Sequence, residues 1–245
     1  MTDYEKICQW WTEKRIGNGN ALFSALNGFS VDFAYHSGKL ENSRITFQDV
    51  KEIFDNDSVV AYTGDLKTLF EIHNEKQAYK LFLKAFDKKR PVEEGLVKEF
   101  QRALTENTYD ERRWRLDERP GEYKKHNFVI GVHEIGAAAE DVPQEMQELL
   151  EELQDIPADR ILTAAAYFHV KFENIHPFAE GNGRTGRLAM NYFLVTHDHP
   201  PITIHEEDRK VYYDALDIWD RTLDLKPLEG FLQEQCVKTW SEDVR

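Results

Sequence analysis

The chain has 245 residues, 41% of them hydrophobic, which supplies enough apolar side chains for one large domain or two small ones. Its formal net charge at pH 7 is −14, and a surface this acidic repels phosphate backbones and anionic lipids. We therefore expect no nucleic-acid or membrane partner, whereas a single nucleotide needs only a local positive pocket and remains compatible with this charge.

The N-terminal residues give no sign of a secretory signal. Residues 4–15 carry charges throughout, and no apolar run in the sequence approaches the roughly 20 residues that a membrane span needs. The two cysteines, Cys8 and Cys236, lie near opposite ends of the sequence without metal-ligand spacing, as is usual in a reducing compartment. We expect a soluble, cytoplasmic protein.

The first third of the chain is predicted to be helical. Thr46 followed by Asp49 resembles a capping box that opens a helix over residues 47–54, and residues 66–86 have the pattern of a long, aromatic-rich helix. Charge and a proline interrupt the pattern at residues 88–91 (KKRP), which makes this the best candidate for a boundary.

One segment in the middle of the chain is predicted to be extended. Residues 127–132 (NFVIGV) favour a strand that continues to Ile135, and an Ala-rich loop follows. Beyond it, apolar side chains recur at helical spacing in four stripes, which begin at residues 146, 161, 211 and 228. The fold is therefore predicted to be all-α, mainly a helical bundle, with one short β-hairpin.

Residues 176–187, HPFAEGNGRTGR, contain the groups of a nucleotide-phosphate site. The segment that follows, residues 188–195 (LAMNYFLV), is predicted to be a buried helix. The Gly-Asn-Gly run at 181–183 then lies at a helix N-terminus, where unpaired backbone N–H groups and the helix dipole favour an anion. Gly181 and Gly183 let the backbone approach phosphate oxygens without a Cβ in the way.

The side chains of this segment suit phosphate chemistry. His176 precedes a proline, which ends the preceding helix, and its imidazole can accept a hydroxyl proton at neutral pH. Glu180 offers a hard oxygen ligand for Mg²⁺. Arg184 and Arg187 offer planar forks to phosphate oxygens, and Asn182 can add a contact. The candidate nucleotide-binding residues of the loop are Glu180, Gly181, Asn182, Gly183, Arg184, Thr185, Gly186 and Arg187.

The same segment matches the signature of the Fic family, H-P-F-x-[DE]-G-N-G-R-x-x-R, at every defined position, so the chain resembles that family. Weaker resemblance covers about residues 90–235. It implies a Fic core there, an N-terminal helical region over 1–89 and a C-terminal tail over 236–245. It also implies a helical fold of the Fic type and a nucleotidyltransferase, namely a protein adenylyltransferase that moves AMP from ATP onto a protein hydroxyl and releases pyrophosphate.

The resemblance assigns roles within the loop. It implies that His176 deprotonates the target hydroxyl and that Glu180 holds Mg²⁺. The nest at 181–183, with Asn182, would bind the α- and β-phosphates, and Arg184 and Arg187 would grip the β/γ end of ATP. In-line attack at the α-phosphate needs mainly positioning and charge stabilisation, and such a loop supplies both.

Residues 123–135 resemble the flap of the family, a hairpin that aligns the target segment by strand addition. This resemblance implies that the nucleotide is contacted by Ile130, Gly131, Val132 and His133. The chain departs from its relatives at two places, because Lys124 stands where they often carry Arg and Gly136-Ala137 replaces a common proline pair. An ordinary edge hairpin is the alternative interpretation.

Residues 209–213 (RKVYY) resemble the family element whose tyrosine contacts adenine. The resemblance makes Tyr213 the candidate, with Tyr212 as its neighbour. Asp220 falls where a relative carries Asn, which would alter the contacts to the base. The alternative is that the two tyrosines only pack a helix.

The segment 37–42 (SGKLEN) fits [ST]-x-x-x-E-[GN], which in this family marks an inhibitory helix. The candidate inhibitory residues are Ser37, Glu41 and Asn42. The resemblance implies that Glu41 pairs with Arg187 and so removes the fork that should hold the γ-phosphate. The alternative is a solvated helix face.

These expectations define one leading hypothesis and its rivals. The leading one is an autoinhibited, Mg²⁺-dependent enzyme that uses ATP and modifies a Ser, Thr or Tyr hydroxyl of a protein target, including itself. The second is the reverse reaction, in which Glu41 orients a water that removes AMP. The third is a nucleotide-sensing interaction module without catalysis. Transfer of UMP or phosphocholine and assembly into a homo-oligomer also remain open.

Overall fold

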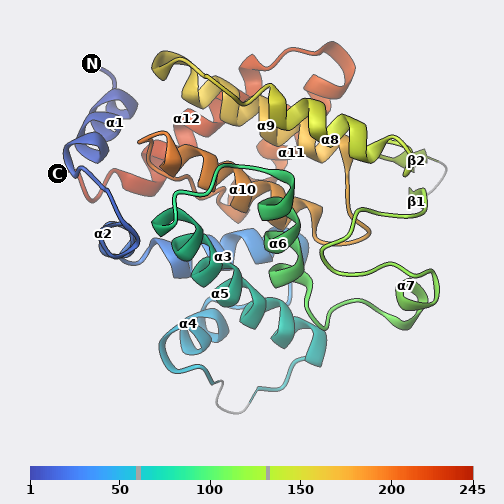
Figure 1. Cartoon of the computed structure of the whole chain (residues 1–245). Coiled ribbons are helices and arrows are strands. Elements are labelled where there is room, and N and C mark those ends of the chain that lie inside the picture. Colours follow the sequence, from blue (N-terminus) through green and yellow to red (C-terminus); the bar gives the residue numbers. More distant parts are fainter. Residues whose placement is uncertain (59–61, 131–132, 245) are drawn as a thin grey trace.

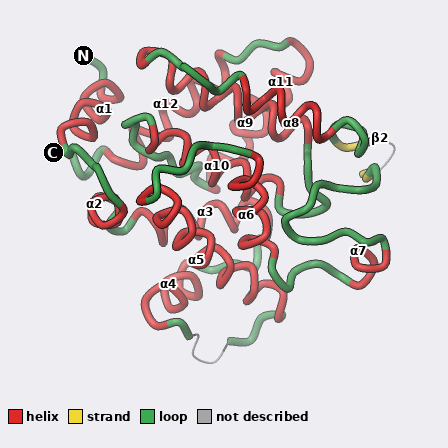
Figure 2. The backbone as a smooth tube through the Cα atoms, viewed as in Figure 1, coloured by secondary structure: helices red, strands yellow, loops and turns green. Residues whose placement is uncertain are grey.

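The structure is a computed structural model that describes residues 1–58, 62–130 and 133–244. Helices dominate this part of the chain (Figures 1 and 2). The α-helices are α1 (Asp3–Glu13), α2 (Gly19–Ala25), α3 (Phe29–Glu41), α4 (Phe47–Asn56), α5 (Leu66–Asp87), α6 (Glu94–Thr105), α7 (Glu111–Arg115), α8 (Val142–Glu151), α9 (Ile161–Ile175), α10 (Asn182–Thr196), α11 (Arg209–Thr222) and α12 (Lys226–Trp240). Two short 3₁₀ helices are η1 (Ala158–Arg160) and η2 (Glu206–Asp208).

Side-chain caps explain where several helices begin. The Thr46 hydroxyl accepts a hydrogen bond from the backbone N–H of Asp49, which opens α4 at the predicted residue. Asp65 caps α5 in the same way through the N–H of Thr68. Both predicted helices are confirmed, and each is slightly longer than its pattern indicated.

Helix α10 lies at the centre of the molecule (Figure 1). It packs against α9 on one side and against α6, α5 and α3 on the other. Nearly all of its side chains are buried, as its apolar sequence predicted. Every neighbouring element is therefore placed relative to the loop that leads into this helix.

One hydrophobic core joins the N-terminal and C-terminal parts of the chain. It includes Trp11 of α1, Phe82 of α5, Phe168 of α9 and Trp240 of α12. The Trp11 and Trp240 rings lie 5.4 Å apart, so α1 packs on α12 and both ends of the chain lie on the same side of the molecule (Figure 1). The predicted boundary at residue 235 falls inside α12.

The β structure of the described residues is a single antiparallel pair at the edge of the molecule (Figure 2). Strand β1 (Phe128–Ile130) pairs with β2 (His133–Ile135), with Phe128 opposite Ile135 and Ile130 opposite His133. Each strand has three residues, which is shorter than the extended run predicted from the sequence. The architecture is otherwise helical, as expected.

None of the described helices combines the length and apolar character that crossing a bilayer requires.

Candidate active site

The loop between α9 and α10 is held in a tight turn. His176 ends α9 in the left-handed conformation (φ 51°), and the Phe178 ring is completely buried in the core. The Asn182 amide accepts from the N–H of Phe178 and donates to its carbonyl, both at 2.8 Å. This corrects the expectation that the Asn182 side chain faces a phosphate, because the amide closes the turn instead.

The N-terminus of α10 offers backbone N–H groups to an anion. Gly181 precedes the helix at φ 82°, and among the described residues no side chain caps the first turn. A Cβ at Gly183 would collide with the Glu41 carboxylate, so this glycine lets α3 approach the loop. Residues 181–183 therefore form the N-terminus of α10, as predicted, and the Glu41 carboxylate lies beside them.

Arg187 is bound by the segment predicted to be inhibitory. Its Nη2 donates to Glu41 Oε1 at 2.9 Å and to the Ser37 carbonyl at 2.9 Å, and its Nε donates to Ser37 Oγ at 3.1 Å. The Arg187 side chain is 1% exposed and that of Glu41 is 40% exposed. Burial opposes ionisation of Glu41, but the charge and hydrogen bond of Arg187 outweigh it and lower the pKa of the carboxyl. The predicted ion pair is therefore present.

Arg184 is buried against α6. Its side chain is 4% exposed, and Nη1 donates to the Leu104 carbonyl at 3.1 Å. The nearby carboxyl of Glu75 is buried, and this burial raises its pKa to about 7 against the opposing charge of Arg184. In this state the first arginine of the motif fixes α6 against α10, contrary to the expectation of a free phosphate-binding fork.

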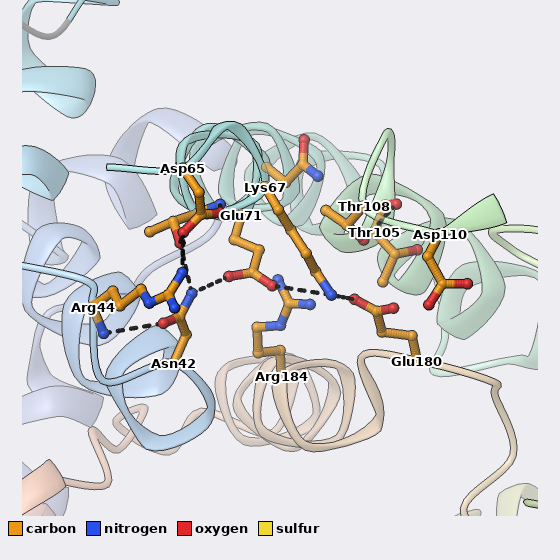
Figure 3. Close-up of polar contacts among 12 residues, drawn as sticks. Asn42, Arg44, Asp65, Lys67, Glu71, Thr105, Thr108, Asp110, Glu180 and Arg184 are labelled. Carbon is orange, nitrogen blue, oxygen red and sulfur yellow. Dashed lines mark hydrogen bonds and ion pairs between the residues drawn. The ribbon is translucent and has the colours of Figure 1, made fainter. Parts of the chain in front are cut away.

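The Glu180 carboxylate lies between two cations that were not among the expected site residues. Lys67 Nζ is 2.8 Å from Oε1 (Figure 3). Arg113 Nη1 is 3.3 Å from Oε2. Lys67 also lies 3.9 Å from Glu71, whose other oxygen accepts from the amide of Asn42 at 2.7 Å. These residues come from α5, α7 and the end of α3, far apart in sequence, so no local pattern could reveal the cluster.

His176 is half-buried, and both of its neighbours in the chain are bonded to the segments that flank the strand pair. The backbone N–H of Lys124 donates to the Pro177 carbonyl and that of Ala137 donates to the Ile175 carbonyl, both at 2.9 Å. Burial, assisted by the charge of Lys124, lowers the pKa of His176 to about 4. The ring is therefore neutral at pH 7 and carries a lone pair that can accept a proton.

The predicted flap residues are placed only by their backbone. Ile130 and His133 face each other at the end of the strand pair. Gly131 and Val132 lie outside the described residues. Contact between these four residues and a nucleotide stays a prediction.

The two tyrosines of α11 have different surroundings. Tyr212 is 1% exposed, and its hydroxyl lies 2.7 Å from Nε2 of the buried His169, so it is a core residue and not a base contact in this state. Tyr213 is 38% exposed and lines a cavity of about 340 Å³ together with Glu173 and Asp220. Asp220 accepts from the Asn174 amide at 3.2 Å. Tyr213 and Asp220 therefore remain the candidates for contacts to a base.

A separate group of potential metal ligands lies between α3 and the residue that precedes η2. Asp32, His36 and His205 present ligand atoms within 4.8 Å of one another. Nδ1 of His36 already accepts from the backbone N–H of Glu206 at 3.1 Å. This group lies outside the loop and is not needed for its chemistry.

The segment that contains this loop matches a known protein family. The sequence profile of the Fic/DOC family matches residues 91–194. The chain is 28% identical over 227 residues to "Protein adenylyltransferase Fic" of Drosophila persimilis, a match that covers 91% of this chain and 42% of that protein. The chain thus spans less than half the length of the curated relatives it matches.

Solved structures share the fold. A Fic-domain-containing signaling protein from Bacteroides thetaiotaomicron superposes with a TM-score of 0.80 at 23% identity, covering 99% of this chain and 96% of that one. Fic-1 from C. elegans superposes with a TM-score of 0.77 at 18% identity, covering 98% and 71%. Residues 91–194, which include the whole of the loop described above, therefore match the Fic/DOC family.

Proposed function

We propose that this chain is a protein adenylyltransferase that uses ATP and Mg²⁺ and is inhibited by its own Glu41. The observation that carries the proposal is the position of a neutral imidazole, His176, directly before a loop that ends at the uncapped N-terminus of α10. A base beside an anion-binding helix end is what transfer of a nucleotidyl group requires. The relatives named protein adenylyltransferase support AMP as the group transferred.

The proposed reaction needs one proton acceptor and one anion-binding site. The oxygen of a target hydroxyl attacks the α-phosphorus of ATP, and the bond to the oxygen that bridges to the β-phosphorus breaks. Pyrophosphate leaves with that electron pair, and His176 accepts the hydroxyl proton. The amides of α10 and the Arg187 guanidinium stabilise the charge on the phosphates.

Glu180 fits the role of a magnesium ligand. It contributes a hard carboxylate beside the helix end that would bind the phosphates, and its buried Oε2, which lies 3.3 Å from Arg113 Nη1, makes no hydrogen bond to the described residues. Mg²⁺, when bound, would neutralise phosphate charge. The predicted set of one carboxylate plus phosphate oxygens is the usual one for this ion.

Inhibition would follow from competition for Arg187. With Glu41 and Ser37 on the guanidinium, the γ-phosphate has no access to it. ATP could then bind only in a pose unsuited to attack. The flap, the adenine contacts of Tyr213 and Asp220, and the protein target are part of the same proposal.

The test is transfer from ATP labelled at the α-phosphate in the presence of Mg²⁺. We expect the Glu41→Gly variant to transfer label to protein, itself included, at a rate at least about tenfold above that of the parent. The reason is that its Arg187 guanidinium is free to hold the γ-phosphate in line. Glu41→Gly/His176→Ala should show no label above background.

Two results would contradict the proposal. If Glu41→Gly is no more active than the parent at several Mg²⁺ and ATP concentrations, inhibition by Glu41 is wrong. If Glu41→Gly/His176→Ala labels protein as fast as Glu41→Gly, His176 is not the base. ATP labelled only at the γ-phosphate should give no labelled protein, which separates AMP transfer from phosphorylation.

The reverse reaction is a second candidate, favoured by the state of Glu41. Its carboxylate is ionised and partly exposed beside the loop, so it can orient a water molecule. Incubation of an AMP-modified target with the parent chain would detect this activity as free AMP, and Glu41→Gly should abolish it.

A further inference from the structure

Two cations of different character neutralise Glu180. Arg113 is fixed by several bonds, since Nη1 lies 2.6 Å from Asp110 Oδ2 and Nε donates to the Ala179 carbonyl at 3.2 Å. Lys67 is 48% exposed and forms ion pairs with Glu180 at 2.8 Å and with Glu71 at 3.9 Å. Arg113 therefore belongs to the scaffold of the loop, whereas Lys67 is a long side chain in the first turn of α5 that can leave.

The ammonium of Lys67 lies against a Glu180 oxygen that must be free in order to bind a metal ion. A Mg²⁺ ion binds a carboxylate oxygen at roughly 2.0–2.1 Å and requires near-octahedral ligands around it. An ammonium 2.8 Å from the same oxygen occupies that space and repels a divalent cation. Lys67 and a metal ion therefore exclude each other at Glu180 Oε1.

We propose that Lys67 is a tethered counter-ion of Glu180 that a divalent cation must displace, so that this lysine sets the metal affinity of the site. The inference rests on the proposed function to the extent that Glu180 is the metal carboxylate. It makes Lys67 a positioning residue, because it acts on the metal through Glu180 and not on the reacting atoms.

The structure provides a second place for the displaced ammonium. Glu71 is largely buried, and its Oε1 is the nearer oxygen to Lys67, while its Oε2 accepts from Asn42 at 2.7 Å (Figure 3). A small change of side-chain rotamer moves the ammonium from Glu180 to Glu71 without exposing an unpaired carboxylate. The exchange therefore leaves no buried charge without a partner.

The experiment measures Mn²⁺ binding and not turnover. Mn²⁺ is titrated by electron paramagnetic resonance in the presence of α,β-methylene-ATP, which cannot transfer AMP, with every protein carrying Glu41→Gly. We expect Lys67→Met to bind Mn²⁺ about three- to fivefold more tightly, the size of one partly exposed ion pair. Lys80→Met, which removes an exposed lysine from the same helix and gives the same net charge, should leave the affinity unchanged.

Glu180→Gln separates this inference from the proposed function. If Glu180→Gln weakens Mn²⁺ binding while Lys67→Met changes nothing, Lys67 is not a competitor and only the present inference is wrong. If Lys67→Met weakens Mn²⁺ binding, the ammonium holds a phosphate, which also overturns the inference. If Glu180→Gln binds Mn²⁺ like its parent, the metal assignment of the proposed function fails, whatever the transfer assay gives.

The double variant completes the test. In the Glu180→Gln background, Lys67→Met should have no further effect on Mn²⁺ affinity, since the two residues act on one carboxylate. An equal gain in both backgrounds would mean a general charge effect and would contradict the inference. Thermal unfolding of each variant checks that the fold is retained.

Discussion

At Gly136 the main chain approaches His176 more closely than a residue with a side chain would allow. A Cβ built at this glycine (φ 76°) would collide with the His176 Cβ and with the Ile175 carbonyl. The next residue, Ala137, donates its N–H to that carbonyl. Gly136, one of the two residues that replace the proline pair, thus lets the chain after β2 lie directly against His176.

We predict that Gly136→Ala, introduced with Glu41→Gly, slows labelling from α-labelled ATP by about tenfold or more. The added methyl group must push the strand pair or the imidazole out of place, and such displacements are costly in a site that depends on positioning. The measurement is the initial rate of AMP transfer. Gly17→Ala, where nothing lies within 4 Å of the added carbon, is the control. A rate equal to that control would show that the close approach is unimportant.

The residues of the loop could be named from the sequence, but not all of their contacts. His176 ends α9, Gly181 precedes α10 and Arg187 pairs with Glu41, and these contacts were expected. The side-chain contacts of Asn182 and Arg184 were not, because their partners are backbone groups at Phe178 and Leu104 that only the folded chain brings near. A motif identifies chemical groups, whereas the direction of each group depends on contacts distant in sequence.

At the scale of elements, the position of α3 depends on the residue that ends it. Asn42 is the C-cap of α3, and its amide donates to Thr68 Oγ1 at 2.9 Å and to Glu71 Oε2 at 2.7 Å. These bonds fix the end of α3 to the first turn of α5. Glu41 is the residue immediately before this anchor, which holds that end of α3 beside Arg187.

We predict that Asn42→Ala raises AMP transfer several-fold above the parent, but less than Glu41→Gly does. Loss of two hydrogen bonds, each worth about 1 kcal/mol, lets the end of α3 leave α5 more often while the carboxylate itself is kept. Initial labelling rates test this, with the exposed neighbour Ser43→Ala as the control. A rate no higher than the parent's would exclude the anchor from the inhibitory contact.

Sequence patterns predicted some elements and missed others for a physical reason. Helix α4 has a cap and one apolar face, so its periodicity is visible. Helix α3 packs in two directions, because Phe29, Phe33 and Leu40 face the main core while Ala34 belongs to a second cluster with Val31 and Tyr35 against it. Its apolar residues therefore form no single stripe, and only its last residues could be recognised by their motif. The strands are too short for alternation to indicate their ends.

At the scale of the whole molecule, the core contains ionisable groups that resist the charged state. Burial lowers the pKa of His169 to about 3 and that of His199 to about 4, and it raises the pKa of Glu173 to about 7. Between pH 4.5 and 6.5 the histidines take up protons on unfolding and Glu173 releases one. Their effects on stability therefore oppose each other across this range.

We predict that Glu173→Gln makes the stability rise more steeply with pH. Folded Glu173 keeps its proton up to about pH 7, whereas the unfolded carboxyl loses it near its ordinary value of 4.5, so this residue destabilises the fold as pH increases. Without it, the free energy of unfolding from urea titrations should increase between pH 5 and 6 by about 1.4 kcal/mol more than in the parent. Glu234→Gln, at an exposed position, should match the parent. Parallel pH profiles for Glu173→Gln and the parent would refute the prediction.

Arg187 is sealed in the interior, whereas its partner Glu41 stands at the surface. The two partners therefore cannot leave the contact in the same way, because only the exposed one has water to go to. Under the proposed inhibition, Glu41 and the γ-phosphate compete reversibly for Arg187, which stays in place. The degree of inhibition should then depend on the concentration of polyphosphate in solution. Arg187 can change partner without a rearrangement of the fold around it.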